Sequence, residues 1–363
     1  MNKCLIVINR PVLIMYFYGL WKNQYIPLKE NVDFFVNQSC LNYLESFRTL
    51  FDLPTGKVYA FEEPTFTSPY YSYYKKCMNL VNNFFQYYGL IKRIKDIPLA
   101  DYKYLLTFSD DMLHLQFLIF DFKKRRKAEG LVFLADNGVD LYLDYQQGPK
   151  SLIRRIIKKV IFPKYAFIPA GCNRLVDIIL ARIPEKCNCS NLRQVRKIDY
   201  RIGEEDFGKW CEVFGVDWNA LMSLKAISNN TILFLGTPFE ELGISHDEII
   251  EFLYAVKELE KSDIIIKPHP KEDFSSYKGH FDLLPSDLPV EILLGGIRFK
   301  FVLSYCSSAL IESSLYGQQT YYFNPPSSSQ NFLSEAIIQA LNIHLYNLIE
   351  GSEVPNFDVN NEH

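Results

Sequence analysis

One stretch in the C-terminal half of the chain decides the fold class: residues 231–270, TILFLGTPFEELGISHDEIIEFLYAVKELEKSDIIIKPHP. Two short apolar runs, 231–235 and 263–266, have the length and residue types of buried strands. Between them, residues 246–261 have the period of an amphipathic helix, which Ser245 can cap. Strand, helix and strand in this order predict a parallel pair joined by a crossover helix.

The same alternation continues on both sides of this stretch. Toward the C-terminus, the pattern predicts a strand at 301–303, a helix at 309–316, a strand at 320–323 and a helix at 333–341. In the N-terminal half, it predicts a strand at 4–8 followed by a helical stretch, strands at 57–61, 104–108 and 131–135, helices at 70–91 and 112–127, and helical or irregular chain over 145–200. We therefore expect an α/β protein with two Rossmann-like domains facing a cleft, over 1–215 and 216–350, and a flexible tail over 351–363.

The bulk composition agrees with two globular domains. A chain of 363 residues is too long for one ordinary core. The net charge of −3 gives no basic field that would hold nucleic acid, so we expect no nucleic-acid partner. The aromatic content of 15% suits stacking on sugar rings, and equally a compositional bias of the genome.

Location and metal binding follow from smaller features. Arg10 and Pro11 interrupt the apolar N-terminus and no cleavage site follows, so we expect a cytoplasmic protein. Two basic segments, 123–127 and 151–161, are either solvated helix faces or docking sites for the inner membrane. None of the eight cysteines forms a Cys-x-x-Cys pair, so we expect no metal and no cofactor.

Polar motifs follow the predicted strands directly, where open parallel sheets bind their ligands. They are Asp136-Asn137-Gly138, Gly236-Thr237-Pro238, His269 and Ser307-Ser308. Any one of them alone would be an ordinary loop. Four such motifs on two units predict a cleft between the domains.

Each motif suits a specific chemistry. Pro268 and Pro270 restrain the backbone around His269, whose imidazole could neutralise a phosphate or protonate a leaving group. Ser307 and Ser308 open a helix and are either phosphate ligands or a helix cap. Asp136 is either a general base for an acceptor hydroxyl or a turn residue, and its spacing does not choose between them.

Together these motifs resemble those of bacterial sialyltransferases. Residues 264–270, IIIKPHP, resemble their HP motif, residues 304–310, SYCSSAL, resemble their paired-serine motif, and residues 136–138, DNG, resemble their acidic-acidic-glycine motif. Order and spacing agree over about 104–325. The resemblance is to the lipooligosaccharide α-2,3-sialyltransferases and the related capsular polysialyltransferases. Asn137 departs from the family pattern, which has a second acid there.

The resemblance implies a GT-B fold, with an N-terminal acceptor domain and a C-terminal donor domain. It implies a metal-independent, inverting transfer of sialic acid from CMP-sialic acid to a lipooligosaccharide or capsular glycan. Asp136 would be the general base and His269 would bind the CMP phosphate. Other donor contacts would come from Pro268, Ser307, Ser308, Gly236, Thr237 and, at the ribose, Glu291.

Two other interpretations remain. Polymer-forming transferases that use CDP-glycerol or another nucleotide-sugar donor also carry Pro-His-Pro and paired serines, although they lack the acidic-glycine motif at this place. A non-catalytic glycan-binding protein of the same shape is the second. The retained Asp136, His269 and paired serines argue against it.

Overall fold

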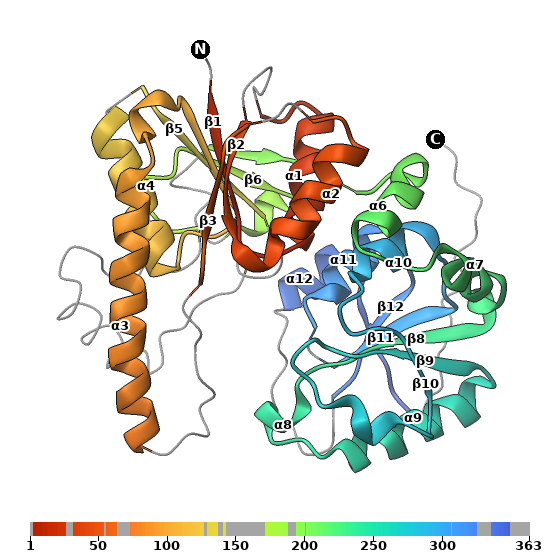
Figure 1. The fold of residues 1–363 in the computed structure, drawn as a ribbon. Coiled ribbons are helices and arrows are strands. Elements are labelled where there is room, and N and C mark those ends of the chain that lie inside the picture. Colours follow the sequence, from red (N-terminus) through yellow and green to blue (C-terminus); the bar gives the residue numbers. More distant parts are fainter. Residues whose placement is uncertain are drawn as a thin grey trace. The chain divides into compact units, whose positions relative to one another are not determined.

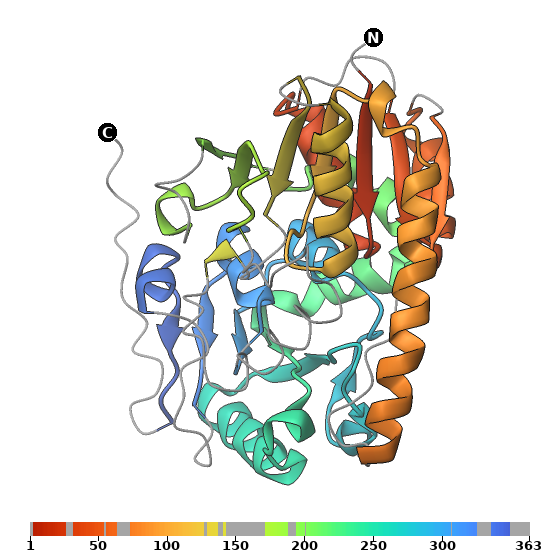
Figure 2. The same ribbon diagram turned by 90° about the vertical axis from the view of Figure 1, so that its left-hand side faces the viewer.

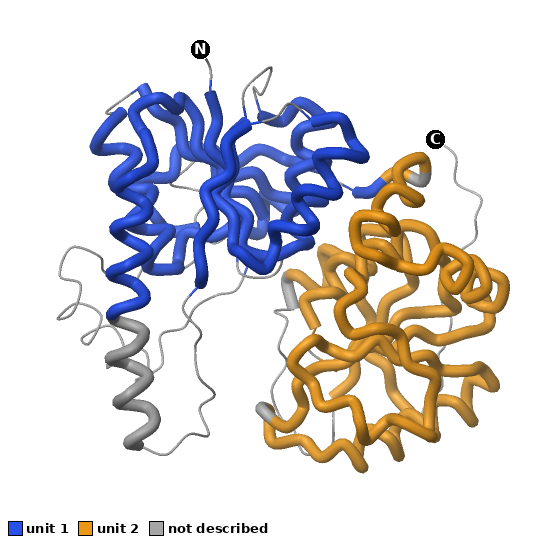
Figure 3. The backbone as a smooth tube through the Cα atoms, viewed as in Figure 1, with its two compact units in different colours: residues 1–202 blue, residues 203–363 orange. Residues whose placement is uncertain are grey.

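The computed structural model describes residues 3–26, 32–53, 56–63, 73–126, 129–136, 141–142, 171–187, 194–199, 201–305, 307–324 and 335–348. The chain divides into two compact units, Met1–Ile202 (unit 1) and Gly203–His363 (unit 2), which Figure 3 colours separately. The division falls earlier than the expected boundary at 215. The reason is that α6 (Phe207–Val213) packs against α10 (Val290–Gly296), where Phe207 lies so close to Gly296 that a side chain there would collide with it.

Unit 1 is built on a parallel sheet with the strand order β3-β2-β1-β4-β5-β6-β7 (Figure 1). Its strands are β1 (Cys4–Ile8), β2 (Val32–Asn37), β3 (Val58–Phe61), β4 (Tyr104–Thr107), β5 (Leu131–Ala135), β6 (Ile178–Ala181) and β7 (Gln194–Lys197). Its helices are α1 (Val12–Lys22), α2 (Leu41–Leu50), α3 (Tyr73–Asp96) and α4 (Leu113–Arg126), with 3-10 turns η1 (Gln38–Cys40), η2 (Leu99–Asp101) and η4 (Pro184–Lys186). The pair α1 and α2 lies on one face of the sheet, and α3 and α4 lie on the other (Figures 1 and 2).

The sequence predicted four of these strands and the two long helices, and all six are confirmed. It missed β2, where Asp33 breaks the apolar run of the strand. The carboxylate of Asp33 is buried but fully paired, with Nζ of Lys3 at 2.7 Å and the hydroxyl of Tyr102 at 2.6 Å. It also missed β6 and β7, in the stretch expected to be helical or irregular.

Unit 2 is built on a second parallel sheet, with the strand order β10-β9-β8-β11-β12-β13. Its strands are β8 (Thr231–Leu235), β9 (Asp263–Lys267), β10 (Asp282–Leu283), β11 (Phe301–Ser304), β12 (Thr320–Tyr322) and β13 (His344–Leu345). Beyond α6 and α10, its helices are α7 (Trp218–Ile227), α8 (Phe239–Leu242), α9 (His246–Glu260), α11 (Ala309–Leu315) and α12 (Glu335–Ala340), with 3-10 turns η6 (Glu204–Asp206), η7 (Ser228–Asn230) and η8 (Phe274–Tyr277).

The central strands β8 and β11 of the unit 2 sheet are buried along their whole length, which is why they are mostly apolar. Ile232 and Phe234 of β8 belong to the core cluster that includes Leu253 of α9, and the alternating Leu233 and Leu235 are buried as well. The predicted strand-helix-strand unit is confirmed, with Ser245 accepting a hydrogen bond from the N–H of Asp247 at the start of α9. The later strands and helices of this half are confirmed too.

Three residues of the first basic segment, 123–127, are paired within unit 1. Lys123 pairs with Asp177 at 2.5 Å, and Arg125 and Arg126 donate to backbone carbonyls of Ile97 and Ala100 at 3.1 and 3.0 Å. These bonds tie the last turn of α4 to the residue before β6 and to the chain before β4. The second basic segment, 151–161, lies outside the described residues. Among the described helices, none combines the length and the hydropathy that crossing a membrane requires.

Candidate active site

The carboxyl ends of β8, β9 and β11 lie side by side in the unit 2 sheet. Leu235 at the end of β8 is the register partner of Lys267 on one side and of Ser304 on the other. The loops that follow these three residues therefore leave the sheet at one edge. The donor-side motifs, which are far apart in the sequence, meet there.

The imidazole of His269 is held in one orientation by its own loop. The backbone N–H of Lys271 donates to Nδ1 of His269 at 3.1 Å, and the half-buried ring follows Pro268 at the end of β9. A nitrogen that accepts a hydrogen bond carries no proton, so the neutral ring has its proton on Nε2. His269 can thus donate a hydrogen bond from Nε2 without first taking up a proton.

Glu272 holds this loop to the neighbouring one. Its Oε2 accepts the backbone N–H of His269 at 3.0 Å, and its carboxylate also accepts the backbone N–H of Thr237. The hydroxyl of Tyr277 donates to Oε1 at 2.8 Å. Burial raises the pKa of Glu272 to about 7, against the opposing effect of these donors. A carboxylate therefore links the β8 and β9 loops at the predicted site.

Gly236 is explained by this carboxylate. A Cβ at Gly236 would lie 2.1 Å from Oε2 of Glu272 and 3.0 Å from the backbone nitrogen of His269. Only glycine permits so close an approach. Beside it, the hydroxyl of Thr237 is buried and has no hydrogen-bond partner in the described part of the chain. The prediction named both residues as nucleotide contacts, and the structure adds that Gly236 makes room for Glu272.

Sequence reasoning missed Glu272. It lies between Lys271 and Asp273, which are both exposed, and such a charged run is typical of a solvated loop. The only local signal was Gly236 after β8. Its role becomes apparent only when Glu272, from the loop after β9, is placed beside it.

Two buried charged residues, Lys267 and Glu291, interact electrostatically near the carboxyl end of β9. Nζ of Lys267 donates to the carbonyls of Pro268 and Ser286 at 2.9 and 2.8 Å. Burial lowers the pKa of Lys267 to about 8, and the negative charge of Glu291 acts in the opposite direction. Glu291, in the first turn of α10, is itself buried. The ribose contact suggested for it stays a prediction, and in this structure its charge faces Lys267.

The paired serines have different surroundings. Oγ of Ser307 accepts the backbone N–H of Ala309 at 3.2 Å, so this hydroxyl caps the first turn of α11. The side chain of Ser308 is exposed and makes no capping bond. Ser304, at the end of β11, donates to the carbonyl of Leu235 at 2.7 Å and fixes the strand ends together. Cys306 lies outside the described residues.

Asp136 belongs to unit 1, where it follows β5. It is 0% exposed, and its carboxylate accepts from Nε and Nη2 of Arg182 at 3.0 and 3.2 Å and from the hydroxyl of Tyr142. The backbone N–H of Ile183 donates to the same hydroxyl at 3.3 Å. Burial and the charge of Asp136 hold the pKa of Tyr142 well above its usual range. The carboxylate of Asp136 therefore lies in a buried cluster with Arg182 and Tyr142. Asn137 and Gly138 of the same motif lie outside the described residues.

Comparison with known proteins decides the family. The family model of alpha-2,8-polysialyltransferase matches residues 67–322, which include every predicted site residue. The chain belongs to the alpha-2,8-polysialyltransferase family. A comparison with curated protein sequences found no match.

Solved structures agree on the fold of this polysialyltransferase-family chain. UDP-GlcNAc 2-epimerase from Methanocaldococcus jannaschii is similar at a TM-score of 0.57 and 10% identity, covering 99% of this chain and 94% of that one. The glycosyltransferase of kitacinnamycin is similar at 0.55 and 9%, covering 96% and 87%. UGT89C1 from Arabidopsis thaliana, solved with UDP-L-rhamnose, is similar at 0.53 and 12%, covering 95% and 85%.

These likenesses show the GT-B fold, in agreement with the prediction from the sequence. Because the similar structures include both epimerases and glycosyltransferases, the fold alone does not select an activity. The match to the polysialyltransferase family model selects glycosyl transfer. The protein is a glycosyltransferase of the sialyltransferase type.

Proposed function

We propose that this protein transfers sialic acid from CMP-sialic acid to a hydroxyl of a cell-surface glycan, with inversion at the anomeric carbon. The observation that supports it most is the joining of the β8 and β9 loops by Glu272, with His269 fixed as an Nε2–H donor. That arrangement suits a phosphate that gains charge as it leaves. Lipooligosaccharide and capsule are the acceptors that we propose.

The reaction is a single displacement. The acceptor hydroxyl oxygen bonds to the anomeric carbon of sialic acid, while the bond from that carbon to the phosphate oxygen breaks and CMP departs. Nε2–H of His269 donates to a phosphate oxygen, and the hydroxyls of Ser307 and Ser308 are the other proposed phosphate ligands. A fixed donor stabilises the departing group without reorganisation at the moment of reaction.

The acceptor proton goes to Asp136 in this proposal. In the structure its carboxylate already accepts from Arg182 and Tyr142. The hydroxyl of Tyr142 must therefore turn aside, so that Oδ2 can accept the proton from the substrate. Arg182 keeps the carboxylate in place during that exchange.

The deciding experiment is an assay of donors. The protein is incubated with CMP-sialic acid and a panel of galactosides and sialylated oligosaccharides, and products are read by mass. We expect a mass increase of one or more sialic acid residues. Transfer from CDP-glycerol or a UDP-sugar instead would identify another polymer transferase, epimerised UDP-GlcNAc would identify an epimerase, and glycan binding without turnover would identify a non-catalytic protein.

Metal independence is tested in the same assay. Among the described residues, no three His, Cys, Asp or Glu side chains are grouped to hold a metal ion. We propose that hydrogen bonds from the fixed imidazole and the serine hydroxyls stabilise the charge of the phosphate. Turnover should therefore be unchanged in EDTA. Loss of turnover in EDTA that Mn²⁺ or Mg²⁺ restores would contradict this part of the proposal.

A cytoplasmic location at the inner membrane is also part of the proposal. Its support is the basic amphipathic pattern of residues 151–161 in the sequence. Flotation with vesicles containing anionic lipid tests it, and a variant with Arg154, Arg155, Lys158 and Lys159 changed to Gln is the control. Equal flotation of both proteins would rule out docking through this segment.

A further inference from the structure

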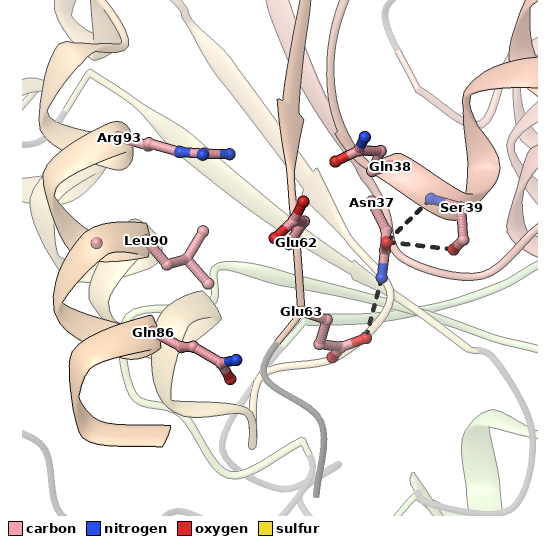
Figure 4. Close-up of a pocket in the computed structure, with 9 residues that line it drawn as sticks. Asn37, Gln38, Ser39, Glu62, Glu63, Gln86, Leu90 and Arg93 are labelled. Atoms are coloured by element: carbon pink, nitrogen blue, oxygen red, sulfur yellow. Dashed lines mark hydrogen bonds between the residues drawn. The ribbon is translucent and has the colours of Figure 1, made fainter. Parts of the chain in front are cut away.

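A pocket of about 460 Å³ opens in unit 1, away from Asp136 and its cluster. It lies where β2 and β3 end, between these strand ends and α3 (Figure 4). Figure 4 shows Gln86, Leu90 and Arg93 of α3 on one side, Asn37, Gln38 and Ser39 on the other, and Glu62 and Glu63 between them. The carboxyl ends of parallel strands are where such sheets bind ligands, so the position itself favours a binding site.

The polar groups that line the pocket are carboxylates, amides, a hydroxyl and a guanidinium. Glu63 is half-buried and accepts from the amide of Asn37 at 3.4 Å, and Asn9 at the end of β1 also donates to it. Burial raises the pKa of Glu63. Arg93 supplies donors on the opposite wall. Hydroxyl groups both donate and accept hydrogen bonds, so carboxylate, amide and guanidinium groups together suit a ligand that is rich in hydroxyls.

Gly89 leaves the α3 wall of the pocket without a side chain at this position. It lies inside the helix, where glycine destabilises by about 0.5–1 kcal/mol relative to alanine. Crowding does not explain it, because a Cβ there would meet no atom within 4 Å. Gly89 instead leaves room above the helix, beside the buried Leu90. A flat wall with an apolar neighbour fits the C–H face of a sugar ring.

We infer that this pocket binds a neutral sugar residue of the acceptor glycan, distinct from the sugar that receives sialic acid. The lining carries two carboxylates and one guanidinium, and Arg10 and Asp111 act on Glu63 with opposite charges, so the excess of negative charge disfavours an anionic residue such as sialic acid. β2 lies three strands from β5, which carries Asp136, so the two places are on the order of 15 Å apart along one sheet edge. A short oligosaccharide spans that distance. The inference rests on the proposed function for the identity of the acceptor.

The test fills the pocket. Gly89→Trp adds a large side chain where the structure has open space, and Gly208→Trp is the matched control, because Gly208 of α6 also has no atom within 4 Å of an added Cβ. With a tetrasaccharide that ends in the sugar accepted in the donor assay, we expect Gly89→Trp to raise KM about tenfold or more, as loss of one or two hydrogen bonds would. With the methyl glycoside of that terminal sugar, which reaches only the transfer position, KM should be unchanged, and Gly208→Trp should behave as wild type with both.

Direct binding separates this inference from the proposed function. Calorimetric titration of wild type, Gly89→Trp and Glu63→Gln with the same tetrasaccharide needs no donor and no turnover, and circular dichroism checks that each variant is folded. If wild type binds the tetrasaccharide and Gly89→Trp does not, the pocket is a sugar site even where CMP-sialic acid proves not to be the donor. Equal affinity of wild type and Gly89→Trp, or equal KM in the assay, would overturn the inference.

Discussion

In the proposed reaction Asp136 takes the acceptor proton and His269 binds the phosphate. The two residues follow strands of different sheets. Asp136 follows β5 of unit 1, and His269 follows β9 of unit 2. Asp136→Asn should lower kcat by about 10²–10⁴, the usual loss of a general base, with little change in CMP affinity. His269→Ala should weaken CMP binding by roughly tenfold or more, because it removes a hydrogen bond to a charged group.

Calorimetric CMP affinity and turnover, measured side by side, check this division. Thermal unfolding of both variants is the control, since Asp136→Asn also alters a buried ion pair with Arg182. Near-normal turnover of a folded Asp136→Asn would leave Asp136 with a structural role only. Equal loss of CMP binding in both variants would show that the two residues share one site.

Glu272 should make stability depend on pH. Its pKa in the folded protein is about 7, against an ordinary value of 4.5. Between these values the folded state binds more protons than the unfolded one, so the free energy of unfolding should fall as pH rises through this window. Three ionisable groups face the carboxylate: Tyr277, His246 with Nε2 at 3.8 Å, and Lys267.

Glu272→Gln should remove most of that slope. The amide oxygen can still accept the backbone N–H groups, and its NH₂ can donate to the hydroxyl of Tyr277, so fold and turnover should persist. Denaturant unfolding at a series of pH values measures the slope, with the exposed Glu258→Gln of α9 as the matched control. A slope that is the same in wild type and Glu272→Gln would assign the effect to another group.

At the scale of the elements, the turn after β8 leaves no room for a side chain at Gly236. Gly236→Ala places a Cβ against Oε2 of Glu272 and the backbone nitrogen of His269. The carboxylate cannot move aside freely, because it accepts hydrogen bonds from the backbone N–H of His269 and the hydroxyl of Tyr277. We expect a loss of about 1–3 kcal/mol in the free energy of unfolding and weaker CMP binding. The reason is that the β8 and β9 loops must separate.

The matched control is Gly208→Ala in α6, where an added Cβ meets nothing within 4 Å. There alanine should be neutral or stabilising, by up to about 1 kcal/mol, since glycine is a poor helix former. Denaturant melts and CMP titrations of the two variants measure the difference. A Gly236→Ala protein as stable as Gly208→Ala would mean that the loop moves aside without cost.

At the scale of the whole molecule, the donor should stabilise the fold that binds it. A ligand at 100 times its Kd adds about 2.7 kcal/mol, which corresponds to a rise in Tm of roughly 5–10 °C for a unit of this size. CMP should produce this rise, and UDP and GDP should produce much less. Thermal scans with each nucleotide measure it, with His269→Ala as the control that should lose the CMP effect. Stabilisation by UDP or GDP but not by CMP would contradict the proposed donor.

The sequence by itself determined the fold class and the position of the donor motifs along the chain. Buried parallel strands are short and apolar, and amphipathic helices have a period of their own, so both can be recognised from neighbouring residues alone. The HP and paired-serine motifs could be placed in the same way, because each directly follows such a strand. β2 was missed since the buried Asp33 is indistinguishable, in sequence, from an exposed one.

Only the tertiary structure decided which side chains meet. Asp136 and Arg182 are far apart in the chain and pair because β5 and β6 are neighbours in the sheet. Glu272 became part of the candidate site because β8 and β9 end at the same edge, and the pocket of unit 1 joins residues of β2, β3 and α3. The physical reason is that strand order is set by how the whole chain packs its apolar surface. Periodicity records which face of an element is buried, but it does not record which element lies against that face.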